Sequence, residues 1–117
     1  MPRKLAQARY DCPVEATLDV IGGKWKGVIL YNLVTTHRFS ELQLNELQLL
    51  IPGVSRRMLT LQLRELERDG LIHREVYREV PATVESSLTE IGQTVSPLSA
   101  HMPDWGEAYA RQIQALR

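Results

Sequence analysis

The sequence predicts a mainly α-helical fold with one small β-hairpin, and three observations lead to this prediction. Residues 55–69 have the periodicity of a two-faced helix, with leucines on one side and arginines on the other. Gly70 supplies a helix stop, and residues 71–80 and 83–88 have the pattern of two strands around a Pro-Ala turn. Further helical segments precede and follow this unit. The order of elements predicts a winged helix-turn-helix with helical additions at both ends.

Size and composition indicate one small globular domain. The chain has 117 residues, of which 44% are hydrophobic, enough for a small core. We expect the domain to cover residues 11–110, after a flexible N-terminal arm at residues 1–10. No apolar run is long enough to cross a bilayer, and the N-terminus has no apolar signal-peptide core. A single cysteine fits a reducing compartment, so we expect the protein to be cytoplasmic.

The net charge is zero, from 14 basic and 14 acidic side chains, and this gives no general indication of a nucleic-acid partner. The distribution of charged residues along the chain is more favourable to DNA binding than the net charge is. No carboxylate lies between Asp19 and Glu41, and the helix at residues 55–69 carries arginines but no acid before Glu65. A neutral protein can bind DNA when one face holds its cations. The composition therefore permits DNA binding without indicating it.

Two helices are expected before the leucine-rich part of the chain. Pro13 suits the first position of a helix that ends at Gly22-Gly23, because the N–H that proline lacks would be unpaired there. A second helix is expected at residues 24–34, with an apolar stripe of Trp25, Val28, Ile29 and Leu33. After a break at residues 35–39, Ser40 is expected to cap a third helix.

A tandem repeat of five residues follows, with Glu-Leu-Gln-Leu-Asn at 41–45 and Glu-Leu-Gln-Leu-Leu at 46–50. Five residues turn a helix by about 140° net, so an extra copy cannot lengthen the third helix with the same face inward. Either the turn before Ser55 becomes longer, or a pair of leucines is exposed or buried against a partner. A tolerated surface insertion is the simpler interpretation.

The helix at residues 55–69 carries the side chains that a DNA major groove selects. Ser55 is a suitable N-cap, and leucines 59, 63 and 66 share one face. Arg57, Thr60, Arg64 and Arg68 lie opposite, with Leu61 beside them. Arginine can pair bidentately with guanine, and an apolar group can contact a thymine methyl. The alternative is a solvated arginine face paired with Glu65 or Glu67.

The C-terminal part of the chain is expected to be helical from Thr89 or Glu90 onward, with interruptions at Pro97 and Pro103. Its last stretch, residues 104–116, carries large apolar side chains at helical spacing. These are Trp105, Tyr109, Ile113 and Leu116.

Several blocks of the chain resemble the HxlR family, bacterial winged helix-turn-helix regulators related to the MarR group. The blocks are Cys12-Pro13-Val14-Glu15, Gly22-Gly23-Lys24-Trp25-Lys26, Arg38-Phe39-Ser40-Glu41-Leu42, Ile51-Pro52-Gly53-Val54-Ser55, Leu63-Arg64-Glu65-Leu66-Glu67-Arg68-Asp69-Gly70-Leu71, Leu88-Thr89-Glu90-Ile91-Gly92 and Trp105-Gly106. The resemblance covers roughly residues 10–110. It departs from the family at the five-residue repeat and at Ser86, where the family usually has tyrosine.

The resemblance implies a homodimeric, cytoplasmic, DNA-binding repressor or activator. It implies a DNA-binding core at residues 24–88 and dimerisation helices at residues 11–22 and 89–117. The expected dimer interface contains Val14, Leu18, Trp105, Tyr109 and Ile113.

Double-stranded DNA is the expected partner, and eight side chains are expected to contact it. They are Ser55, Arg56, Arg57, Thr60 and Arg64 on the central helix, Arg78 near the hairpin tip, and Lys24 and Lys26 as phosphate contacts. An ordinary ion-paired hairpin is the competing interpretation for the wing, because Glu75 and Glu79 alternate with its arginines. For the whole chain, the alternative is a winged-helix protein-interaction module whose DNA binding is weakened by the insertion at 41–50.

Cys12 is the candidate regulatory thiol. At the N-cap of the first helix the helix dipole favours the thiolate, whereas Asp11 disfavours it. Some HxlR-type regulators sense electrophiles or oxidants through such a cysteine; the alternative is a capping residue without a regulatory role. With no second cysteine, oxidation can give a bond between subunits, a mixed disulfide or a sulfenic acid.

The sequence offers no candidate for enzymatic chemistry, a cofactor or a metal site. The three histidines share no metal-ligand spacing with Cys12, and no nucleophile turn, phosphate loop or dinucleotide fingerprint occurs. The operator and any small-molecule effector are not identified by the sequence.

Overall fold

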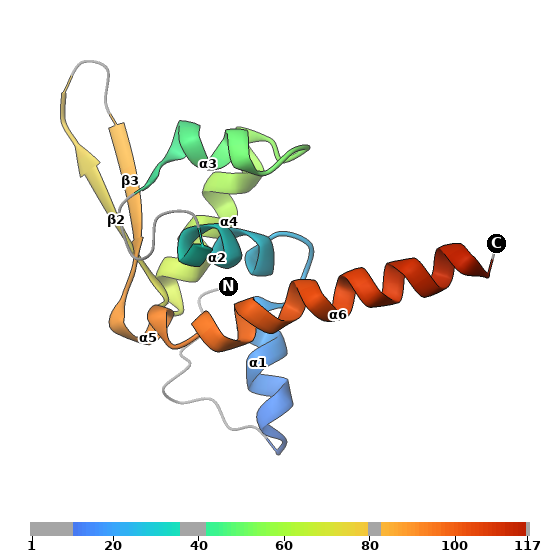
Figure 1. The fold of residues 1–117 in the computed structure, drawn as a ribbon. Helices are drawn as coiled ribbons and strands as arrows, with labels where there is room; N and C mark the ends of the chain where they lie inside the picture. Colours follow the sequence, from blue (N-terminus) through green and yellow to red (C-terminus); the bar gives the residue numbers. More distant parts are fainter. Residues whose placement is uncertain (1–10, 36–41, 80–82, 117) are drawn as a thin grey trace.

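The computed structural model describes residues 11–35, 42–79 and 83–116 (Figure 1). The elements are α1 (Pro13–Ile21), α2 (Lys26–Thr35), β1 (Leu42–Gln43), α3 (Leu44–Leu50), α4 (Arg56–Arg68), β2 (Ile72–Tyr77), β3 (Thr83–Leu88), α5 (Glu90–Gln93) and α6 (Ser96–Ala115). The predicted class, mainly helical with a small hairpin, is confirmed. The predictions for the arm at residues 1–10 and for a cap at Ser40 lie outside the described residues.

The core lies where α2, α3 and α4 pack on one another and on the base of the hairpin. Leucines 59, 63 and 66 of α4 are fully buried, as the periodicity predicts. They pack in one cluster with Ile29, Leu30 and Leu33 of α2, Leu47 of α3, and Ile72 and Leu88 of the hairpin. Burying each such side chain contributes about 1.5–3 kcal/mol, so this cluster fixes α4 against α2 and α3.

The hairpin is part of a three-stranded antiparallel sheet in the order β1-β3-β2. β2 and β3 pair from Ile72↔Leu88 to Tyr77↔Thr83. β1 pairs with β3 at Leu42↔Ser86, so Ser86 lies buried in the central strand between Leu42 and Arg74. The sequence predicted the hairpin but not β1.

The tandem repeat divides between two kinds of structure. The first copy supplies β1 and the start of α3, whereas the second copy, residues 46–50, forms the rest of α3. The extra residues therefore precede α3, and α4 begins after a turn at residues 51–55. Leu49 is 84% exposed and Leu50 is also exposed, in agreement with the alternative that a pair of leucines is uncovered.

Three helix predictions need correction. α2 begins at Lys26 rather than at residue 24, and Val28 of its predicted stripe is exposed. α3 begins at Leu44, and its N-cap residue Gln43 donates its backbone N–H to Glu46 Oε1 at 3.1 Å. α6 runs through Pro103 without interruption, although a proline inside a helix removes the N–H that would bond the carbonyl of Ser99 and crowds that carbonyl.

The C-terminal region forms a short helix followed by a long one. Thr89 Oγ1 donates to the carbonyl of Gly70 at 2.6 Å and accepts from Gly92 N at 3.0 Å, which joins α5 to the end of α4. A Cβ on Gly92 would lie 2.0 Å from the carbonyl oxygen of Leu71, so only glycine fits there. α6 then packs across α2 and extends beyond the rest of the domain (Figure 1).

Candidate nucleic-acid interface

The two ends of α4 are fixed by local hydrogen bonds. Ser55 is the N-cap, and its Oγ accepts from the backbone N–H of Met58 at 3.0 Å. At the other end Gly70 has a φ of +85°, and the N–H of Leu71 bonds the carbonyl of Leu66 at 3.0 Å. This left-handed glycine turn is the C-terminal motif expected of Gly70. α4 therefore has defined ends, and its buried leucines fix which side faces the core.

The side of α4 opposite its buried leucines carries a basic, hollowed surface, which we call the basic face. The basic face is lined by Ser55, Arg56, Arg57, Met58, Thr60, Leu61 and Arg64, around a hollow of about 580 Å³. Five of the eight predicted DNA-contacting residues meet here. Arg57, Leu61 and Arg64 are exposed, while Thr60 is half-buried.

The two glutamates that were expected to compete for these arginines have other partners. Glu65 Oε1 lies 2.6 Å from Lys26 Nζ, and Glu67 Oε1 lies 3.6 Å from Arg74 Nη1. Each carboxylate thus has a cationic partner that lies outside the basic face. The basic face therefore keeps its positive charge.

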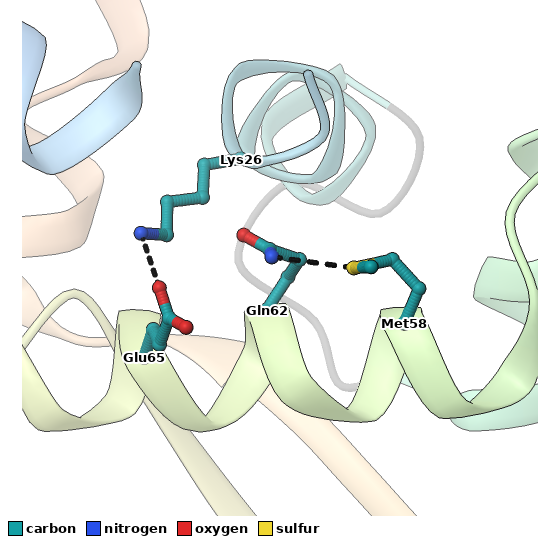
Figure 2. A network of polar contacts seen from close by, with 4 residues as sticks. All are labelled: Lys26, Met58, Gln62 and Glu65. Carbon is teal, nitrogen blue, oxygen red and sulfur yellow. Dashed lines mark hydrogen bonds and ion pairs between the residues drawn. The ribbon is translucent and has the colours of Figure 1, made fainter. Parts of the chain in front are cut away.

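Lys26, a predicted phosphate contact, forms an ion pair within the domain. Lys26 is only 8% exposed, and Figure 2 shows its side chain extending from α2 toward Glu65 on α4. The same figure shows Gln62 Nε2 donating to Met58 Sδ at 3.4 Å on the neighbouring turns of α4. Lys26 thus connects α2 to α4 instead of facing solvent.

Lys24 remains available at the surface. It is exposed, and its Nζ lies 4.8 Å from the centroid of the Trp25 ring. Trp25 is half-buried and packs against the core, as expected for a structural residue rather than a stacking platform. Lys24 is therefore the one residue of the predicted lysine pair that can reach a ligand.

The base of the wing holds an arginine and a histidine with acidic partners, and a second arginine is exposed beyond β2. The Arg74 side chain is largely buried beside Glu67, and its Nε has no hydrogen-bond partner. His73 Nε2 lies 2.9 Å from Glu75 Oε2. Arg78 follows β2, is exposed, and forms no ion pair with the described residues. Of the wing cations, Arg78 is the one that the geometry leaves free for a ligand.

The residues expected to form a dimer interface lie on two helices with exposed apolar surfaces. Val14 and Leu18 of α1 are exposed, and no residue of α1 is buried. On α6 the rings of Trp105 and Tyr109 are stacked with centroids 5.2 Å apart, and Trp105 is 70% exposed. Ile113 is half-buried two turns after Trp105. These surfaces have no cover within the described chain.

Cys12 lies at the N-cap of α1 and is exposed. Its carbonyl accepts from the N–H of Glu15 at 2.9 Å, and Pro13 is the first helical residue, as predicted. Among the described residues, no group of three or more His, Cys, Asp and Glu side chains is arranged to hold a metal ion. No described helix has the length and apolar character needed to cross a membrane.

Two contacts of this region are not indicated by the sequence. Asn45 of α3 accepts a hydrogen bond from Arg56, and Glu65 is the partner of Lys26. No local pattern indicates either contact, because each joins two elements that meet only in the folded chain.

The architecture and the basic face define a winged helix-turn-helix protein of the DNA-binding type. The profile of the family described as "HxlR-like helix-turn-helix" matches residues 20–114, and the chain belongs to this family. The HTH-type transcriptional regulator YdeP of Bacillus subtilis is 58% identical over 105 residues, which are 90% of this chain and 79% of YdeP. The resemblance noted from the sequence is thereby confirmed.

Solved structures give the same result. The redox regulator HypR in its reduced form superimposes with a TM-score of 0.77 at 49% identity, over 89% of this chain and 99% of HypR. Its oxidised form gives a TM-score of 0.72 at 54% identity, over 83% of this chain and 96% of HypR. The chain is thus a DNA-binding transcriptional regulator of the helix-turn-helix type, and this class is not enzymatic.

Proposed function

We propose that the chain is a cytoplasmic homodimer that binds a specific operator, with α4 of each subunit in a major groove and the wing beside it. The observation that carries this proposal is the basic face, whose arginines 57 and 64 are exposed while the leucines behind them are fully buried. A helix held in this way offers its N-terminal half to the groove, as recognition helices do. The two half-sites would lie about 34–36 Å apart or at a multiple of this distance.

The first experiment selects duplexes from a random-sequence pool with the reduced protein. A selected duplex and a scrambled duplex are then titrated by fluorescence anisotropy at low and moderate salt. We expect tighter binding to the selected duplex and an affinity that falls steeply with salt, because each phosphate contact releases counterions. Absence of binding to either duplex at low salt would contradict operator binding and favour the protein-interaction module.

The exposed apolar surfaces of α1 and α6 support the homodimer. Leu18 is 61% exposed and Trp105 more so, and both lie on helices that contribute little to the core of their own subunit. Large exposed aromatic and aliphatic side chains at helical spacing are typical of a contact surface. Sedimentation equilibrium on the reduced protein would test this, and a monomer at micromolar concentration would contradict it.

We also propose that Cys12 makes the regulator responsive to oxidants. Its exposure at the start of α1 and the similarity to HypR, described as a redox regulator, support this role. In one form of the reaction, two Cys12 thiols reduce a hydroperoxide to an alcohol and water and join as one disulfide between subunits. In the others, Cys12 forms a mixed disulfide or a sulfenic acid.

The redox proposal is tested by titrating the selected duplex with protein treated with a hydroperoxide. Mass spectrometry and a non-reducing gel distinguish the three products. We expect a changed operator affinity that returns on reduction, and no change in the Cys12→Ser variant. An unchanged affinity after complete oxidation of Cys12 would remove this part of the proposal and leave operator binding intact.

A further inference from the structure

The two copies of the tandem repeat differ only at their fifth residue, which is Asn45 in the first copy and Leu50 in the second. This difference has a structural counterpart. Asn45 is exposed on α3, and its Oδ1 accepts a hydrogen bond from Arg56 Nη1 at 2.5 Å. A leucine at position 45 would have no group to offer to the guanidinium. The residue that makes the copies unequal therefore forms a side-chain hydrogen bond to α4.

The contact lies at the junction between the helix-turn-helix and the wing. Gln43, Leu44, Asn45, Arg56, Thr83 and Val84 line a small hollow where α3, the start of α4 and β3 meet. Arg56 is also rotated by about 100° around α4 from Arg57. When the basic face enters a major groove, a side chain on its flank lies beside the sugar-phosphate backbone rather than over the base edges.

Arg56 differs from Lys26 and Arg74 in the charge of the side chain that holds it. Lys26 and Arg74 are held by the carboxylates of Glu65 and Glu67, which neutralise their charge. Arg56 is held by a neutral amide, so it keeps its full positive charge. The guanidinium has five N–H donors, and the bond to Asn45 uses one of them. Among the described residues Arg56 has no second acceptor, so its remaining donors can bind an anion bidentately.

We propose that Asn45 is a positioning residue that orients Arg56 to bind a backbone phosphate of DNA at the edge of the recognised groove. This inference rests on the proposed function, because it needs α4 in a major groove. Holding a long side chain in its binding orientation before the complex forms reduces the entropy lost on binding. The repeat then contributes to DNA binding through Asn45, the residue at which its first copy differs from its second.

The test is a double-mutant cycle on the duplex selected from the random pool and on a scrambled duplex of equal length. We expect Asn45→Ala to weaken binding about three- to fivefold, the range for losing one exposed charge-assisted contact. The loss should be the same on both duplexes, because a phosphate contact carries no sequence information. In an Arg56→Ala background, Asn45→Ala should change the affinity by less than about 1.5-fold, since little remains for Asn45 to orient.

Two further variants separate orientation from structural support. Leu49→Ala, on the exposed surface of the same helix, is the matched control and should leave affinity unchanged. Asn45→Asp keeps an acceptor for Arg56 but neutralises its charge and repels phosphate. It should therefore bind DNA more weakly than Asn45→Ala, by about a further threefold. If the contact were only structural, Asn45→Asp would preserve it and would bind DNA about as tightly as the wild-type protein.

Several outcomes would overturn the inference. Equal losses from Asn45→Ala with and without Arg56 would show that Asn45 acts elsewhere, and tighter binding by Asn45→Ala would show that it withholds Arg56 from DNA. Failure of the proposed function is distinguishable, because Arg57→Ala and Arg64→Ala would then also leave binding unchanged. If those two variants weaken binding while Asn45→Ala and Arg56→Ala do not, only the role of Asn45 is refuted.

Discussion

α4 and α6 are both amphipathic helices, but their apolar faces are covered to different extents within the subunit. Leu59, Leu63 and Leu66 of α4 are fully buried among α2, α3 and the hairpin, which leaves the basic face, with Leu61, exposed on the other side. α6 buries only Ser99, and its stacked pair Trp105 and Tyr109 is exposed. The C-terminal part of α6 extends away from the rest of the domain (Figure 1).

The difference assigns distinct tasks to the two helices. A helix whose apolar side is covered within its own subunit is rigidly placed and can present polar groups to a ligand. A helix whose apolar side is uncovered needs another surface, and in a symmetric dimer that surface is the same patch on a second copy. Each prediction below tests one side of this comparison.

The largest effect is expected from removing the exposed part of α6. Truncation after Ala100 removes both stacked aromatic residues but leaves the buried Ser99 in place. We expect monomers by sedimentation, and an operator affinity lower by about 10²-fold or more, because two linked contacts become one. A double variant, Trp105→Ala with Tyr109→Ala, provides a full-length comparison. A stable dimer of the truncated chain would refute the role of α6.

The next effect tests the covered face of α4. Leu63→Ala removes a fully buried side chain from the centre of the core. We expect the free energy of unfolding to fall by about 3 kcal/mol, the typical result of such a truncation. Urea denaturation monitored by circular dichroism measures it. Leu61→Ala on the exposed side of the same helix is the control and should change stability by less than about 0.5 kcal/mol. Equal losses would mean that the two faces of α4 are not distinct.

The sequence allowed these two faces to be predicted because the signal is local. Leucines at positions 59, 63 and 66 repeat with the helical period, and Ser55 and Gly70 mark the ends with side-chain and backbone chemistry that acts over three or four residues. The exposed arginines follow from the same periodicity. No information from distant parts of the chain was needed.

The features that were missed depend on distant partners. β1 has two residues and exists through pairing with β3, so no period identifies it. Lys26 follows an aromatic residue near a helix start and resembles a surface cation until α4 brings Glu65 beside it. The structure of the repeat was also not predictable, because the same Leu-Gln-Leu segment forms β1 and the start of α3 in the first copy and helix alone in the second.

Substitutions on the basic face are expected to have an intermediate effect on DNA affinity. Arg57→Ala or Arg64→Ala should weaken binding to the selected duplex by about 1–3 kcal/mol if the side chain contacts a base. Stability should be unchanged, because both side chains are exposed. Anisotropy titrations on the selected and scrambled duplexes measure affinity and specificity together. Arg68→Ala, one turn beyond Arg64 and outside the lining of the basic face, is the charge-matched comparison and should weaken binding less. Unchanged affinity in both variants would exclude this face as the contact surface.

The smallest effects are expected at Lys24 and Lys26, which differ in burial: Lys24 is exposed and Lys26 is buried. Lys26→Met should lower the free energy of unfolding by about 1 kcal/mol, because Glu65 loses a partner but is itself one-third exposed. It should not change how steeply DNA affinity falls with salt, since a cation held against Glu65 inside the domain releases no counterion.

Lys24→Ala should have the opposite pattern of effects. The free energy of unfolding should stay constant, and the slope of DNA affinity against salt should decrease by about one unit if Lys24 contacts a phosphate. Denaturation and anisotropy at four salt concentrations measure both quantities on the same preparations. A smaller salt slope for Lys26→Met would show that the ion pair opens when DNA binds, and would return Lys26 to the contact surface.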